Sequence, residues 1–101
     1  MTKKEQAQEN AIVKAVFDTG VTKEKVLSTK RLRTCSATVL ETENAYLLKS
    51  YNTVVAILIK ETRELMDGLR YVYGFTRTSA QHISKFGKDY GARRIHTWRS
   101  V

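Results

Sequence analysis

Residues 38–59 read TVLETENAYLLKSYNTVVAILI, and this stretch decides the fold class. Its first part predicts two antiparallel strands, over 38–42 and 45–48, because strand-forming runs flank the polar pair at 43–44. The run 53–59 is apolar after its first threonine and rich in β-branched residues. It is too short for a buried helix, so it predicts a central strand that is covered on both faces.

The chain before this stretch predicts one long helix and a short second one. Thr2 and Glu5 have the spacing of a capping box, in which each residue bonds the backbone of the other. Apolar residues then recur on one helical face, which predicts a helix over 3–17. Residues 21–29 predict a short second helix whose inward-facing apolar residues are Val26 and Leu27.

The chain after the central strand predicts a further strand. Residues 69–75 alternate between two faces, and the preceding Asp67-Gly68 pair predicts a turn with a positive φ. The stretch 61–66 fits either an extension of the hairpin or one helical turn. The residues predicted to share one face of the strand are Leu69, Tyr71, Tyr73 and Phe75.

A second helix is predicted near the end of the chain. Thr78 and Gln81 have the spacing of another capping box, and Gly91 can end the helix in a left-handed conformation. The helix therefore covers 79–90, and the β-leaning residues 95–98 form a last strand. The apolar side of this helix contains Ala80, Ile83, Phe86 and Tyr90.

These elements predict the α+β class in a single domain over 1–101, with a helical N-terminal segment over 1–30 and an α+β core over 31–101. The expected architecture is an N-terminal helix, an antiparallel sheet of about four to five strands, and one helix from the C-terminal half packed on the sheet. Both helices are expected on one face of the sheet.

The composition narrows the class of protein further. The chain has 101 residues, no proline and one cysteine, Cys35, so no internal disulfide can form. One cysteine and two histidines fall short of a structural zinc site, which needs about four ligands. We therefore expect no metal and no cofactor. The polar N-terminus and the short apolar runs predict no membrane association and a cytoplasmic location.

The formal net charge of +8 is concentrated in two segments. Residues 23–33 carry five cations against Glu24, and residues 70–101 carry seven cations against Asp89. The strand region between them is slightly acidic. A basic surface of this kind is typical of a protein whose partner is a polyanion. If the two segments share one face, they form a single basic surface. If they lie on opposite sides, the charge gives much less support to a nucleic-acid partner.

Two places in the second basic segment are candidate binding sites. The start of the predicted helix, with Arg77, Thr78 and Ser79, can hold a phosphate, although simple capping explains every one of these residues without a ligand and is the more common arrangement. His82, one turn further on, fits either a ligand contact or a packed side chain. The tail combines cations with an aromatic ring, which suits nucleic acid but also a charged edge strand. The predicted partner-binding or nucleic-acid-binding residues are Arg77, Thr78, Ser79, His82, Lys85, Lys88, Arg93, Arg94, Trp98 and Arg99.

A sequence resemblance adds a biological context. Residues 50–56 read SYNTVVA, residues 73–79 read YGFTRTS, and His82, Ile83 and Phe86 follow. Together they resemble a family of small uncharacterised bacteriophage and prophage proteins, over residues 45–91. Here Phe75-Thr76 stands where that family more often has Tyr-Ser. The resemblance implies a phage accessory protein that acts by binding, and it brings no activity with it.

Two functions follow as hypotheses. The first is a non-catalytic inhibitor of a host nucleic-acid-directed defence enzyme, similar to an anti-CRISPR protein, whose partner is a host protein–nucleic-acid complex. The second is a module that binds DNA or RNA directly through the basic and aromatic tail. No catalytic motif appears, so no enzyme is predicted, and a hydrolase using His82 and Arg77 is the remaining enzymatic alternative. The sequence leaves a homodimer open.

Overall fold

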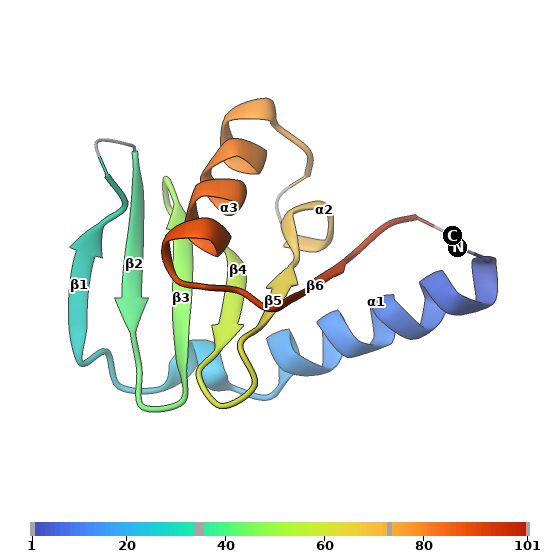
Figure 1. Cartoon of the computed structure of the whole chain (residues 1–101), viewed down its shortest axis with the longest axis horizontal. Coiled ribbons are helices and arrows are strands. Elements are labelled where there is room, and N and C mark those ends of the chain that lie inside the picture. The colour runs from blue at the N-terminus through green and yellow to red at the C-terminus, as the bar shows by residue number, and fades with distance from the viewer. Residues whose placement is uncertain (1, 34–35, 73, 101) are drawn as a thin grey trace.

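The structure, a computed structural model, describes residues 2–33, 36–72 and 74–100. Within these residues the chain forms one six-stranded sheet whose strands lie side by side in chain order (Figure 1). Neighbouring strands are antiparallel from the first strand to the fifth, and the sixth strand is parallel to the fifth. The elements are α1 (Lys3–Asp18), η1 (Val21–Lys23), β1 (Ser28–Arg31), β2 (Ala37–Glu41), β3 (Ala45–Ser50), β4 (Thr53–Ile59), β5 (Glu64–Asp67), α2 (Leu69–Val72), α3 (Arg77–Asp89) and β6 (Arg94–Thr97).

The α+β class is confirmed, and so are the three strands predicted from residues 38–59. β2 and β3 pair on either side of the turn at 43–44, with Val39 opposite Leu48. β4 pairs with β3, with Leu48 opposite Ala56. Buried residues of β4 belong to both apolar clusters of the molecule, so this strand is covered on both faces as its composition predicts.

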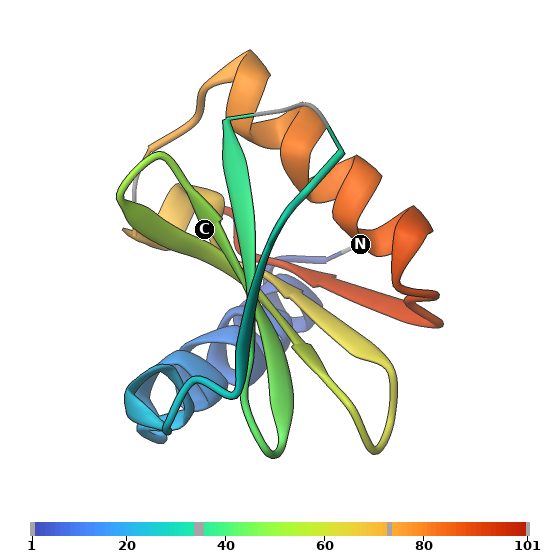
Figure 2. The ribbon, with the colours of Figure 1, turned by 90° about the vertical axis from the view of Figure 1, so that its left-hand side faces the viewer.

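A helix covers each face of the sheet, and Figure 2 shows α1 and α3 on opposite sides of it. The expectation that both helices share one face is wrong. The physical reason is the apolar character of both sides of β4, since each side has to be removed from water. The cluster under α3 includes Leu48, Leu58, Leu65, Ile83 and Phe86. The cluster under α1 includes Val13, Ala45, Leu47, Ile57 and Met66.

The N-terminal segment confirms one predicted helix and corrects the other. Thr2 Oγ1 accepts the N–H of Glu5 at 3.1 Å, and Glu5 Oε1 accepts the N–H of Thr2 at 3.2 Å, so the predicted capping box begins α1. The helix predicted over 21–29 is wrong, because it stops after the 3₁₀ turn η1 and the backbone of β1 then pairs with β2. Val26 and Leu27, predicted to face inward, are exposed.

The strand predicted over 69–75 is also wrong. The strand of this region is β5, and the short helix α2 follows it. Leu65 and Met66 are neighbours in the chain but are buried on opposite faces of the sheet. The alternative of a hairpin extension over 61–66 is therefore the correct one, and Tyr73 lies outside the described residues.

Gly68 is required by space rather than by its backbone angle. The positive φ predicted there is wrong, since the described glycines with that conformation are Gly20, Gly74 and Gly91. A Cβ atom at Gly68 would instead overlap the ring of Phe17, near the end of α1. Glycine therefore allows α1 to lie closely over the connection between β5 and α2.

α3 confirms the predicted late helix, although it begins earlier in the chain. Its N-cap is Thr76, whose Oγ1 accepts the N–H of Ser79 at 3.1 Å, so the capping box predicted from Thr78 and Gln81 is wrong. Gly91 has a φ of +69°, as predicted for the end of the helix.

The last strand, β6, lies close to its predicted place but pairs differently. α3 carries the chain back along the sheet before β6 begins, so β6 runs parallel to β5. The sheet of the described residues therefore has six strands rather than four to five, and it is mixed rather than antiparallel. The strand that the sequence does not predict is β1, whose four residues are all exposed.

Candidate functional site

Two of the predicted site residues lie in the interior, where they join β3 to α3. Ser50 Oγ lies 2.9 Å from Ser79 Oγ and 3.0 Å from His82 Nδ1, and all three side chains are buried. Burial lowers the pKa of His82, and the charge of Lys85 acts in the same direction. The motif positions Ser50, Ser79 and His82 thus form a buried polar contact between a strand and a helix.

Three of the other predicted residues, Lys88, Trp98 and Arg99, line a groove between α3 and β6. A hollow of about 420 Å³ lies between these elements. A smaller hollow of about 90 Å³ lies beside it, and the two share Asp67, Ala80 and Thr97. We call the combined feature the α3–β6 groove. Its further lining residues are Leu69, Arg70, Phe75, Ile83, Ser84, Gly87, Lys88, Ala92, Ile95, Trp98 and Arg99.

Arg77 and Lys85 line a further hollow along α3. Thr78, Arg93 and Arg94 are exposed, and Arg94 Nη2 lies 3.8 Å from Glu9 Oε1.

Asp67, at the end of β5, is the acidic residue of this groove. One of its oxygens, Oδ1, accepts the N–H of Leu69 at 3.2 Å. Burial raises the pKa of the carboxyl group, while that hydrogen bond and the charges of Arg99 and Arg70 act in the opposite direction. A half-buried carboxylate therefore lies within electrostatic reach of two guanidinium groups.

The rim of the groove carries exposed apolar side chains beside its cations. Phe75 is 62% exposed and Ile95 is 57% exposed. The guanidinium carbon of Arg70 lies 5.0 Å from the centre of the Phe75 ring. Trp98, the aromatic residue predicted for nucleic-acid stacking, packs on Tyr71 with ring centres 4.5 Å apart. Phe75 is thus the more accessible aromatic surface of the groove.

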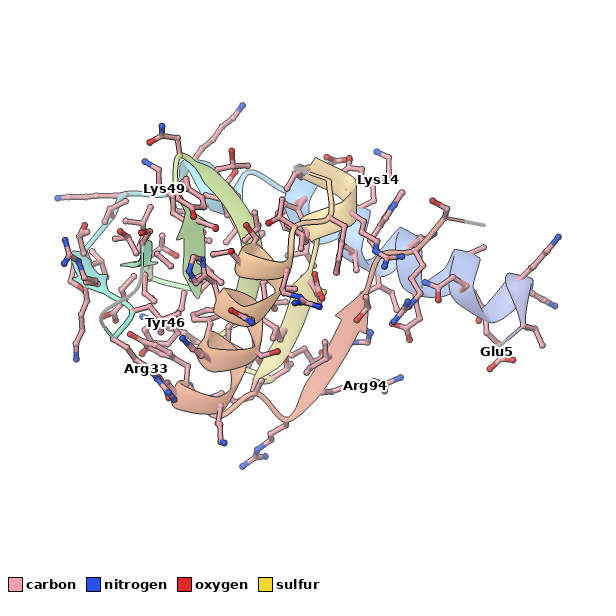
Figure 3. The ribbon with its side chains drawn as sticks, turned by 90° about the horizontal axis from the view of Figure 1, so that it is seen from above. Glu5, Lys14, Arg33, Tyr46, Lys49 and Arg94 are labelled. Carbon is pink, nitrogen blue, oxygen red and sulfur yellow. The ribbon has the colours of Figure 1, made fainter. Side chains whose placement is uncertain are left out.

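The two basic segments meet at one end of α3. Arg33 Nε donates to Asp89 Oδ2 at 2.7 Å. Around this pair lies a hollow of about 360 Å³, whose lining includes Lys30 and Arg31. Figure 3 shows Arg33 and Arg94 on either side of the C-terminal end of α3.

The beginning of the first basic segment lies elsewhere. Lys23 ends η1, which contacts α1, and residues 24–27 lead from it to β1, away from α3 (Figures 1 and 2). Lys49 also lies on the side opposite Arg33 and Arg94 in Figure 3. The basic segment 23–33 is therefore divided, and only its last part joins the surface around α3.

On the other face, α1 is fastened to the same strands by buried polar contacts. His96, only 2% exposed, lies between two carboxylates, with Nδ1 2.5 Å from Glu9 Oε2 and Nε2 2.6 Å from Glu64 Oε2. His96 therefore bridges a glutamate of α1 and a glutamate of β5. The contact to His96 lowers the pKa of Glu64.

A second contact attaches α1 beyond the end of β6. The Asn10 amide donates to the carbonyl oxygen of Arg99 at 2.6 Å and accepts the N–H of Arg99 at 3.0 Å. Gln6 donates to the carbonyl oxygen of Thr97 at 2.9 Å. These bonds hold the backbone of two groove residues, Thr97 and Arg99, in place.

Several residues of the site were not predicted from the sequence. The sequence predicts a turn at Asp67 and places Phe75 on one face of a strand, while Arg70 contributes only to the charge of residues 70–101. Gly74, next to Phe75, is the signal in the sequence that could indicate a loop rather than a strand. Asp67 has no comparable signal, because its neighbours in the groove come from α3 and β6.

The comparisons with known proteins add no further identification, since no protein family, no curated protein and no solved structure matches this chain. Among the described residues, no helix has the length and apolar character needed to span a membrane.

Proposed function

We propose that this protein is a non-catalytic binding protein whose α3–β6 groove and surrounding cations hold the phosphates of a nucleic acid. The observation that carries the proposal is the distribution of charge around α3. The acidic residues that line the hollows on this face are Asp67 and Asp89, and Asp89 is bonded to Arg33. The cations that line them are Lys30, Arg31, Arg33, Arg70, Arg77, Lys85, Lys88 and Arg99.

The physical basis of the proposal is the release of counterions. Each phosphate that a lysine or arginine neutralises frees condensed cations from the nucleic acid, so affinity falls as salt rises. Exposed side chains along a groove can contact successive phosphates of one strand, and Phe75 offers a surface on which a base can stack. Sequence-independent binding of this kind needs no catalytic group.

The test is the salt dependence of binding to fluorescently labelled single strands and duplexes, measured by fluorescence anisotropy. We expect a log–log slope of about −0.7 for each phosphate neutralised on a single strand. A variant with Arg70, Lys88 and Arg99 replaced by glutamine should bind more weakly and show a slope reduced by about two units.

The control variant replaces Lys23, Lys25 and Lys49 by glutamine and loses the same charge away from α3. It should keep most of the affinity. Equal losses in both variants would show that net charge alone causes binding, and undiminished binding by the groove variant would remove the groove from the site.

A second candidate function is inhibition of a host nucleic-acid-directed defence enzyme, as the phage resemblance implies. The observation that favours it is the exposure of Phe75 and Ile95, since apolar side chains within a polar rim are typical of protein interfaces. The test adds the purified protein to a CRISPR effector complex before and after nuclease treatment. A complex that survives nuclease with the original protein, and is lost with Phe75→Ser and Ile95→Ser, supports this function over direct nucleic-acid binding.

A further inference from the structure

The place of Asp67 in the groove is unexpected for a surface that binds only phosphates. Its carboxylate belongs to both hollows of the α3–β6 groove, where the neighbouring charged side chains are Arg70, Lys88 and Arg99. A phosphate close to this carboxylate would be repelled. The group that meets Asp67 must therefore donate hydrogen bonds, while the rest of the same ligand can meet the cations.

Asp67 has unused capacity to accept hydrogen bonds. A carboxylate has about four acceptor sites. Among the described residues, the side chain of Asp67 accepts one hydrogen bond, from the N–H of Leu69 to Oδ1. Burial raises the pKa of this carboxyl group, which means that its charged form is poorly solvated. A ligand with N–H donors would restore hydrogen bonds that water supplies incompletely there.

The surroundings of Asp67 fit a nucleotide with its base turned inward. Phe75 is exposed and can stack on a base. Arg70 and Arg99 line the same hollow as Asp67 and can meet the phosphates on either side of that base. The groove therefore combines an acceptor, an aromatic face and two cations.

We propose that the α3–β6 groove binds a guanine base of a single-stranded nucleic acid, with the guanine N1–H and N2–H donors bonded to the carboxylate of Asp67. This inference rests on the proposed nucleic-acid function. Guanine is the base whose Watson–Crick edge offers two adjacent donors to the two oxygens of a carboxylate. Adenine and cytosine place a ring acceptor beside their amino group, and thymine flanks its single N–H with two carbonyls. The nucleic acid has to be single-stranded, because base pairing in a duplex already uses the Watson–Crick edge of guanine.

The experiment measures the affinity of the full chain for three labelled nine-residue thymidine oligonucleotides whose central base is guanine, hypoxanthine or adenine. Hypoxanthine keeps N1–H and lacks the 2-amino group, so it tests the second donor without any change in the protein. We expect guanine to bind about tenfold more tightly than adenine, the lower range for a bidentate base contact. Hypoxanthine should fall between them.

Asp67→Asn is the matched protein variant. An asparagine keeps an oxygen for the N–H of Leu69, but one of its two terminal groups becomes a donor. We expect this variant to lose the guanine preference and to keep its affinity for the all-thymidine strand. Glu43→Gln, a change at an exposed carboxylate in the turn between β2 and β3, should leave the preference intact.

The outcomes separate this inference from the proposed function. Binding to all the strands with equal affinity overturns the guanine site and leaves phosphate binding standing. An undiminished preference in Asp67→Asn, or hypoxanthine binding as tightly as guanine, also overturns it. Failure to bind any strand at low salt contradicts the proposed function itself.

Discussion

The two faces of the sheet use polar residues in opposite ways. Under α1, Glu9, Glu64 and His96 are joined to one another, and the amide of Asn10 is joined to the backbone. Around α3, the interior is apolar except for one serine–histidine contact, and the cations surround a groove that contains Asp67. The charged side chains under α1 bond to one another and so attach that helix to the sheet. The cations at the rim of the α3–β6 groove remain available to a ligand.

Among the tests of this comparison, Phe86→Ala is expected to have the largest effect on the free energy of unfolding. Phe86 is fully buried in the cluster that holds α3 on the sheet. Its removal leaves a cavity and should lower the free energy of unfolding by about 3 to 5 kcal/mol. Urea denaturation measures this loss, with Ile12→Ala, at a 39% exposed position on α1, as the control. A loss no greater than that of the control would show that α3 is not held by its apolar side.

An intermediate effect is expected from His96→Gln, on the opposite face. A glutamine side chain cannot reach both carboxylates, so Glu9 and Glu64 are left close together without the ring between them. We expect a loss of roughly 2 to 3 kcal/mol, below the range for a fully buried ion pair because both glutamates are partly exposed. Hydrogen exchange should rise in α1 more than in α3. Equal protection of both helices would contradict the role of His96 as the fastening of α1.

The smallest effect is a pH dependence that sharpens the same contrast. The hydrogen bond to His96 lowers the pKa of Glu64 below its ordinary value of 4.5. The stability that this group contributes is present above that value and is lost as the pH falls through the lowered pKa. Urea midpoints should therefore drop in acid more steeply for the original chain than for Glu64→Gln. Parallel pH curves for the two proteins would contradict the contribution of this contact.

The parts of the fold that were predicted have local patterns. β4 can be predicted from its apolar run, and α3 from the helical spacing of its apolar residues. In both elements the pattern of burial is visible in the residues of the element itself. β1 has no buried residue and hence no alternation, so the sequence could not indicate it. β5 buries Leu65 and Met66 on opposite faces, which erases the alternation expected of an exposed strand.

The site was harder to predict than the fold. Its cations could be counted in the sequence, but the groove is formed by β5, α3 and β6 together. Only the tertiary structure brings Asp67 near Arg99, and only the loop after α2 exposes Phe75. The sequence leaves Ser79 and His82 open between ligand contacts and packed side chains, and only the structure shows their contact with Ser50.

The amide of Asn10 has a consequence for how separate copies of the chain behave in solution. By accepting the N–H of Arg99 and donating to its carbonyl oxygen, this side chain occupies the backbone groups that another strand would seek at the margin of a sheet. Gln6 occupies the carbonyl oxygen of Thr97 in the same way, by donating to it. A chain shortened to begin after Asp18 would offer these groups to its neighbours, and it should self-associate at concentrations where the full chain stays dispersed.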